Sequence, residues 1–155
     1  MHLWEIKAFG DLDLKEFHDL IALRISVFVI EQNCPYQELD GKDQHSIHVM
    51  GKKDGEIVAT ARIVAPGLSY SEPSIGRVLT ISAARGTGLG HELMEETMKA
   101  AKNHFGNVPI RMSAQEHLIN FYQVHGFEPV SDVYLEDNIP HVEMLYNPHN
   151  NTINS

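Results

Sequence analysis

The spacing of hydrophobic positions near the start of this chain predicts one strand followed by one helix. Residues 4–9 alternate between apolar and polar side chains, which is typical of a half-buried strand. Asp13 and Glu16 then stand at the spacing of a capping box, which marks a helix start. Over residues 14–28 the apolar positions recur with a helical period. The polar segment 31–44 that follows is predicted to be an ordered loop.

A hairpin, a buried strand and a long helix are predicted for the middle of the chain. Residues 47–52 and 56–65 are strand-like segments joined by an Asp-Gly pair, which is a strong signal for a two-residue turn. The apolar run 75–81 is typical of a buried strand. Residues 91–105 then place their apolar side chains at helical spacing.

The last third of the chain predicts a strand, a helix and a final strand pair. Residues 107–114 form the strand, and residues 116–125 form a helix that Gly126 ends. Residues 127–135 and 141–146 make the final pair. The whole order predicts an α/β fold in which one continuous mixed sheet is flanked by helices.

Composition narrows the class of protein. The 155 residues, of which 43% are hydrophobic, predict one domain over residues 1–147 with a polar tail over 148–155. A net charge of −9 argues against a nucleic-acid surface, and no apolar run approaches the ~20 residues that span a membrane. The N-terminus lacks the features of a signal peptide, and a single cysteine cannot form an internal disulfide. We therefore expect a cytoplasmic protein.

The most informative segment is the glycine-rich turn 85–90, Arg-Gly-Thr-Gly-Leu-Gly, between the predicted strand 75–81 and the predicted helix 91–105. Such a turn presents backbone N–H groups and the positive end of a helix dipole to one point, which suits a phosphate or pyrophosphate. A Walker loop would need a lysine in the turn, and none is present. A dinucleotide fingerprint would need a third glycine where His91 stands.

The remaining pattern is Arg-x-x-Gly-x-Gly at Arg85, Gly88 and Gly90, which resembles the acyl-CoA pyrophosphate loop of the GNAT acetyltransferase family. The segment 121–127, Phe-Tyr-Gln-Val-His-Gly-Phe, resembles the late helix of that family. Further segments are similar to the ElaA-like branch of GNAT proteins, and they cover most of the chain: 24–32, 34–41, 75–78, 113–117 and 136–141. Gln115 departs from the broad family, in which many members have Asn at this position.

The resemblance implies a GNAT acyl-CoA N-acyltransferase fold and an enzyme that transfers an acetyl group from acetyl-CoA directly to a primary amine. The backbone of one strand segment would pair with the pantetheine arm of the donor: Leu79, Thr80 and Ile81. The turn and first helical residues would hold the pyrophosphate: Arg85, Gly86, Thr87, Gly88, Leu89, Gly90 and His91. The Gln115 amide would also contact the donor.

The resemblance also implies catalytic roles. Tyr122 is the candidate acid that protonates the departing thiolate. It is also expected to contact the donor. An ammonium acceptor must lose a proton before it attacks, and a carboxylate or histidine would serve as the base. The candidates for this base are Glu31, His48, His117 and His141.

Several of these residues also have a purely structural interpretation. Tyr122 could pack its ring in the core, His48 could be a surface or packed histidine, and His141 could cap a loop. His45 and His48 would point to opposite faces of a strand, so no metal site is predicted. Cys34 is interpreted as packing or pocket wall because no neighbouring base is identifiable. The acids of the 31–44 segment either line an entrance for a cationic amine or form a solvated loop.

Two other functions stay open at this point. A CoA-binding sensor or interaction module with little catalytic activity would have the same fold, and a nucleotide-binding regulator could use the same turn. The acceptor is expected to be a small-molecule or peptide amine whose identity the sequence does not give. A homodimer is a reasonable expectation for a sheet of this kind.

Overall fold

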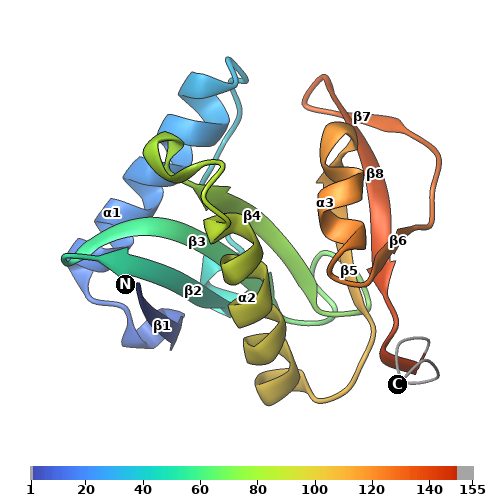
Figure 1. Ribbon diagram of the computed structural model, residues 1–155, viewed down its shortest axis with the longest axis horizontal. Helices are drawn as coiled ribbons and strands as arrows, with labels where there is room; N and C mark the ends of the chain where they lie inside the picture. The colour runs from blue at the N-terminus through green and yellow to red at the C-terminus, as the bar shows by residue number, and fades with distance from the viewer. Residues whose placement is uncertain (1, 150–155) are drawn as a thin grey trace.

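The computed structural model describes residues 2–149, and within this part of the chain one sheet of eight strands is flanked by helices (Figure 1). The strands are β1 (Leu3–Ala8), β2 (Ser46–Lys53), β3 (Glu56–Val64), β4 (Ser74–Thr80), β5 (Ile110–Gln115), β6 (Phe127–Pro129), β7 (Tyr134–Glu136) and β8 (Ile139–Tyr146). The α-helices are α1 (Leu14–Arg24), α2 (Leu89–Phe105) and α3 (Ile119–Gln123). The strand order is β1-β2-β3-β4-β5-β8-β6, and β7 also pairs with β8. The predicted α/β class with a mixed sheet is confirmed.

The sheet is forked between β4 and β5. These two strands are parallel neighbours, but the only residues in register are Ser74 and Arg111, at the start of each strand. Beyond that point the strands diverge, as Figure 1 shows. A β-bulge on β4 opposite Thr60–Arg62 puts Arg77 at φ 52°, an uncommon conformation for a residue with a side chain. The fork leaves one edge of β4 without a strand partner.

The first helix begins as predicted. The Glu16 amide donates to the Asp13 carboxylate at 2.7 Å, and the Asp13 amide donates to the Glu16 carboxylate at 3.0 Å, which completes the capping box. The α-helix ends at Arg24, and the chain continues as a π-helix over Ile25–Glu31. A single regular helix toward residue 28 was therefore the wrong expectation. The π-helix is rich in β-branched residues, which crowd a regular α-helix, and such wide turns are frequent at functional sites.

The two hairpins differ in how well the pattern predicts them. Asp54 and Gly55 adopt φ values of 53° and 80° between β2 and β3, as the Asp-Gly signal requires. The single strand predicted over residues 127–135 is instead two short strands, β6 and β7, which both pair with β8. The second turn is tighter than predicted, because Asp137 and Asn138 both adopt left-handed conformations and β8 begins at Ile139.

The late helix is shorter than the pattern predicts. Residues Glu116–Leu118 form a 3₁₀ turn, α3 follows, and Gly126 ends the segment at φ 91°. Helix α2 lies in front of the sheet in Figure 1 and α1 lies behind it. Leu93 and Met94 of α2 are fully buried against the sheet. Among the helices of residues 2–149, none is both long enough and apolar enough to cross a membrane.

The predicted tail, 148–155, lies outside the described residues apart from its first two positions. The domain boundary at residue 147 stays a prediction.

Candidate functional site

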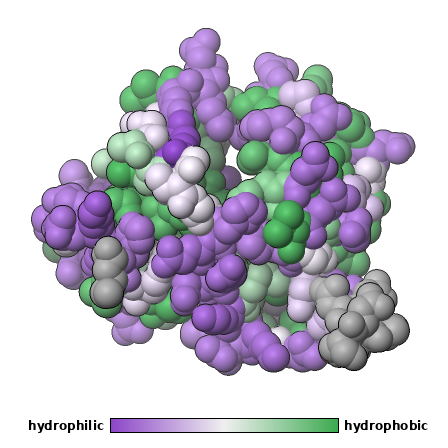
Figure 2. All heavy atoms as spheres, viewed as in Figure 1, coloured by the Kyte–Doolittle hydropathy of each residue, from purple (hydrophilic) through white to green (hydrophobic). Residues whose placement is uncertain are grey.

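The fork between β4 and β5 opens into a cleft of about 1160 Å³. Its walls come from β4 and the π-helix on one side, and from β5, α3 and the β7–β8 turn on the other. The first turn of α2 closes one end. Figure 2 shows the hollow between the two halves of the molecule, with polar and apolar side chains around its rim. A cleft of this size and mixed lining suits an extended ligand with polar groups.

The glycine turn presents its backbone to the cleft. Gly86 and Gly88 adopt φ values of 81° and 88°, which a residue with a side chain reaches only with strain. Gly88 is the N-cap of α2, and among the described residues no side chain caps the first amides of this helix. Those N–H groups and the helix dipole are available to an anion, as the sequence predicts.

Not every residue of the predicted donor site faces the cleft. Leu79, Thr80, Arg85, Gly86, Gly88, Gly90, His91, Gln115 and Tyr122 line it. The Leu89 side chain is buried in the core, and the Thr87 hydroxyl donates to the Ala84 carbonyl. The Ile81 amide donates to the Val58 carbonyl at 2.9 Å and is therefore not free to pair with a ligand. Leu89 and Thr87 could therefore contact the donor only through their backbone groups. The Ile81 N–H group is not free for the pairing with the pantetheine arm that the sequence predicts.

Arg85 is paired with Glu31, a residue predicted for a different role. Both guanidinium Nη atoms donate to the Glu31 carboxylate, and both side chains are more than 40% exposed. The hydrogen bond from Arg85 holds the pKa of Glu31 below its ordinary value. A carboxylate that is stabilised in its charged form is a poor proton acceptor. Glu31 is therefore better suited to holding Arg85 beside the glycine turn than to acting as the base.

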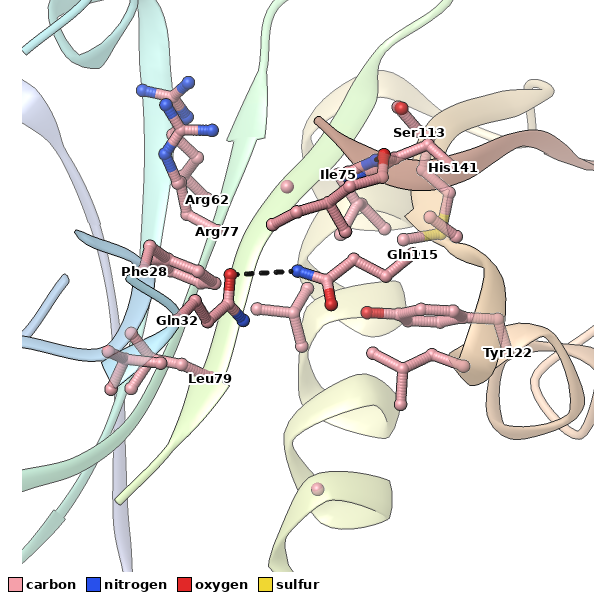
Figure 3. Close-up of a pocket in the computed structure, with 18 of the residues that line it drawn as sticks. Phe28, Gln32, Arg62, Ile75, Arg77, Leu79, Ser113, Gln115, Tyr122 and His141 are labelled. Carbon is pink, nitrogen blue, oxygen red and sulfur yellow. Dashed lines mark hydrogen bonds between the residues drawn. The ribbon is translucent and has the colours of Figure 1, made fainter. Parts of the chain in front are cut away.

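Tyr122 lies in the wall of the cleft, with a side chain that is almost fully buried (4% exposed). Its ring packs edge-on against Phe121 and Phe127. Burial raises the pKa of the phenol far above its ordinary value, so the hydroxyl keeps its proton at physiological pH. Figure 3 shows this hydroxyl pointing into the cleft toward Gln115, and among the described residues it has no hydrogen-bond partner. The geometry makes Tyr122 available as a proton donor.

Gln115 spans the cleft. Its Nε2 donates to the Oε1 atom of Gln32, at the end of the π-helix, at 3.2 Å (Figure 3). In the close-up this hydrogen bond lies between Tyr122 and a far end formed by Arg62 and Arg77 on one wall and by Ser113 and His141 on the other. The cleft thus has an anion end at α2, a middle part at Tyr122 and a polar far end.

The four histidine and carboxylate candidates for the base are not brought together. His141 and His117 line the cleft, as Glu31 does. His48 does not line it: the side chain is 1% exposed, and its Nε2 lies 3.0 Å from the Asp43 carbonyl oxygen. Burial lowers the pKa of His48, as expected for a neutral core histidine. The position of His48 therefore fits its interpretation as a packed histidine and gives no support to its predicted catalytic role.

A network of six charged side chains, four of them buried, backs one wall of the far end. Its members are Arg24, Arg62 and Arg77 with Glu38, Asp40 and Asp43. Arg24 donates to Glu38 at 2.6 Å and to Asp43 at 2.9 Å. Burial alone would raise the pKa of Asp43, but the bonds and charges of Arg24 and Arg62 lower it. Sequence reasoning missed this network and took its acids for a solvated loop or an entrance. The signal for it was an arginine inside each of two apolar segments, Arg24 and Arg62.

Cys34 fits the packing interpretation. It is buried, and its Sγ lies 3.4 Å from the Asp137 carbonyl oxygen, so the thiol joins the loop after the π-helix to the β7–β8 turn. Within residues 2–149, no cluster of three or more His, Cys, Asp or Glu side chains is placed to hold a metal ion.

Comparisons with known proteins agree with the fold and the site. Residues 16–147 match the family described as an acetyltransferase (GNAT) domain. Protein ElaA of Escherichia coli is 42% identical over 143 residues, which cover 91% of this chain and 94% of ElaA. The crystal structure of E. coli ElaA superposes with a TM-score of 0.90 at 40% identity and covers 95% of this chain and all of that one. An acyl-CoA N-acyltransferase from Pseudomonas aeruginosa gives a TM-score of 0.90 at 45% identity, covering 94% of this chain and 99% of that one.

Proposed function

We propose that this chain, which belongs to the GNAT acetyltransferase family, transfers an acetyl group from acetyl-CoA to a primary amine. The observation that carries the proposal is the layout of the cleft. An anion-binding helix start, an unpaired strand edge and a buried phenol follow one another along it. This sequence of features matches a donor with a pyrophosphate, an amide-containing arm and a thioester.

The donor would lie along β4. Its pyrophosphate would accept hydrogen bonds from the amides of the glycine turn and would take Arg85 from Glu31. Its pantetheine amides would pair with the free edge of β4 near Leu79 and Thr80 as an added strand. The Gln115 amide would exchange its bond to Gln32 for one to the thioester arm.

The reaction is direct attack in a ternary complex. The amine nitrogen forms a bond to the thioester carbonyl carbon, and the bond from that carbon to sulfur breaks. The amine proton goes to a base in the cleft. Of the histidines that the sequence suggests for this role, His141 and His117 line the cleft. Tyr122 gives its proton to the departing thiolate and regains one from water. The products are an N-acetylated amine and CoA.

The proposal is tested by following free-thiol release with acetyl-CoA and a panel of amines. Tyr122→Phe should lower kcat about a hundredfold, because general acid catalysis contributes on the order of 10²–10⁴. The variant should keep the rise in melting temperature that CoA causes, since the anion end is unchanged. Tyr146→Phe is the matched control, because Tyr146 packs against Phe127 and does not line the cleft.

Three outcomes separate the proposal from its rivals. Turnover that Tyr122→Phe lowers about a hundredfold supports the enzyme. Stabilisation by CoA with no turnover of any amine favours a CoA sensor. Stabilisation by ATP or NAD but not by acetyl-CoA favours a nucleotide-binding regulator. The cytoplasmic location and the homodimer are parts of the proposal that rest on the sequence alone.

A further inference from the structure

The two walls at the far end of the cleft differ in chemistry. In Figure 3, Arg62 and Arg77 lie on one wall, and Ser113 and His141 face them from the other. Lys42 lines the arginine side and Glu136 lines the histidine side of the same cleft. The amine that attacks the thioester must enter from this end, since the glycine turn closes the other one. The hydrogen-bonding groups of the two walls therefore indicate what the acceptor carries.

The histidine wall presents acceptors. His141 Nδ1 lies 2.7 Å from the Ile139 carbonyl oxygen, which can only accept, so Nδ1 carries the proton. The other ring nitrogen, Nε2, faces the Glu136 carboxylate at 3.5 Å. Glu136 is fixed by the Ser113 hydroxyl, which donates to it at 3.0 Å. A carboxylate and an imidazole lone pair that face one place are suited to a primary ammonium group, and the imidazole can take its proton.

Among the described residues, the arginine wall carries one buried N–H group without a hydrogen-bond partner and one ammonium group without a carboxylate partner. The Nη atoms of Arg62 bind Asp40 and Asp43, but its Nε is buried and has no hydrogen-bond partner among residues 2–149. A buried N–H without a partner is rare in folded proteins, because it loses its bond to water without replacement. Lys42 donates to the Ser69 hydroxyl at 3.0 Å, and within the described part of the chain no carboxylate lies at ion-pair distance from it.

Charge balance singles out Lys42 and Glu136. The three arginines of the charge network are matched by three acids, so the network is neutral as a whole. Lys42 on one wall and Glu136 on the other stand outside it, with opposite charges. Asp137, which is exposed beside Glu136, adds negative charge to the histidine wall. A purely cationic amine would be matched by Glu136 but would leave Lys42 without an anion.

We propose that the acceptor is an amino acid, that is, a primary amine that also carries a carboxylate. Its ammonium group lies between Glu136 and His141, and its carboxylate accepts a hydrogen bond from Lys42 on the wall that also carries the positive charge of Arg62. This inference rests on the proposed acetyl transfer and adds the class of its acceptor. The same placement makes His141 the residue that takes the amine proton, with Glu136 as the residue that positions and stabilises the imidazolium.

The test compares amines that differ only in the carboxylate. With the full chain and saturating acetyl-CoA, thiol release is measured for L-amino acids, for their carboxamides, and for ω-amino carboxylates against alkylamines of equal length. A charge-assisted hydrogen bond contributes roughly 1.5–3 kcal/mol, so kcat/KM for the acids should exceed that for the neutral analogues by about tenfold or more. Carboxamides have less basic amines, which favours them chemically, so a preference for the acid cannot come from amine basicity.

Two variants test which wall of the cleft binds the carboxylate and which binds the amine. Lys42→Met should lower the ratio of kcat/KM between acid and carboxamide about tenfold. Lys15→Met is the matched control and should leave that ratio unchanged, because Lys15 is 76% exposed on α1 and does not line the cleft. Glu136→Gln should lower kcat/KM for acids and carboxamides alike, since both bring the same amine.

The results separate this inference from the function on which it rests. If diamines, alkylamines, peptides or carboxamides are acetylated as well as amino acids, the acceptor class is wrong while acetyl transfer stands. If Lys42→Met lowers the rates with acid and carboxamide equally, its role is structural and the carboxylate site is refuted. If no amine of any class is turned over, the proposed function itself fails and this inference falls with it.

Discussion

The buried charge network makes a strong prediction about stability. Arg24 is 2% exposed and donates three hydrogen bonds, at 2.6 Å to Glu38 and at 2.9 and 3.2 Å to Asp43. Arg24→Met keeps most of the side-chain volume and removes the charge, so the network changes from neutral to a net charge of −1. Breaking a buried ion pair on one side costs about 3–5 kcal/mol, because the remaining charge stays away from water. We expect the free energy of unfolding to fall by this amount.

Urea unfolding at neutral pH, followed by the fluorescence of the only tryptophan, Trp4, gives the free energies directly. Arg24→Lys should lie between wild type and Arg24→Met, because an ammonium retains the charge but cannot form the two-sided contact. Arg85→Met is the matched control, because it also removes an arginine that binds a carboxylate through two nitrogens. The Arg85–Glu31 pair is exposed, so its loss should leave the urea midpoint unchanged. An Arg24→Met protein within about 1 kcal/mol of wild type would refute the reasoning.

Two further predictions concern packing and pH. Gly51→Ala should cost about 1–3 kcal/mol, because the new Cβ would lie 2.7 Å from the Trp4 ring, whereas Gly10→Ala has open space and should be neutral; equal urea midpoints for the two would contradict this. Burial alone would raise the pKa of Glu16. Its hydrogen bonds, of which the one from Lys52 has the largest effect, outweigh burial and lower the pKa to about 2. The stabilisation from Glu16, about 1–2 kcal/mol after allowance for solvent screening, should thus be complete above pH 4.5 and be lost as the pH falls toward 2. An acid-unfolding curve of Glu16→Gln as steep as that of wild type would count against it.

The sequence predicts the strand and helix order well because each of those elements has its own local signal. The capping box at Asp13, the Asp-Gly turn after β2 and the glycine turn before α2 depend on short-range geometry, and all three are where the pattern places them. The fork between β4 and β5 has no such signal. It arises because a bulge at Arg77 turns β4 away from β5, and a bulge depends on the register between strands that are distant in sequence.

The charged residues show the same limit. Each acid of the segment 31–44 looks solvated when it is considered alone, since isolated carboxylates are rarely buried. Glu38 and Asp43 are nevertheless buried, because Arg24 from α1 and Arg62 from β3 meet them in space. An arginine in an apolar run is the hint that such a partner exists, but the sequence does not say which acid it is.

Arg85 and Glu31 show how the fold can pair two residues that the sequence assigns to separate roles. Both line the cleft, and the sequence assigns one to the pyrophosphate and the other to the amine. The π-helix brings Glu31 to the anion end instead, where it binds Arg85. A guanidinium that already has a carboxylate partner is held in place, so the phosphate of the proposed donor would meet an oriented cation when it replaces this carboxylate. The same pairing makes Glu31 a poor base, so in the proposed reaction the amine proton is taken at the far end of the cleft.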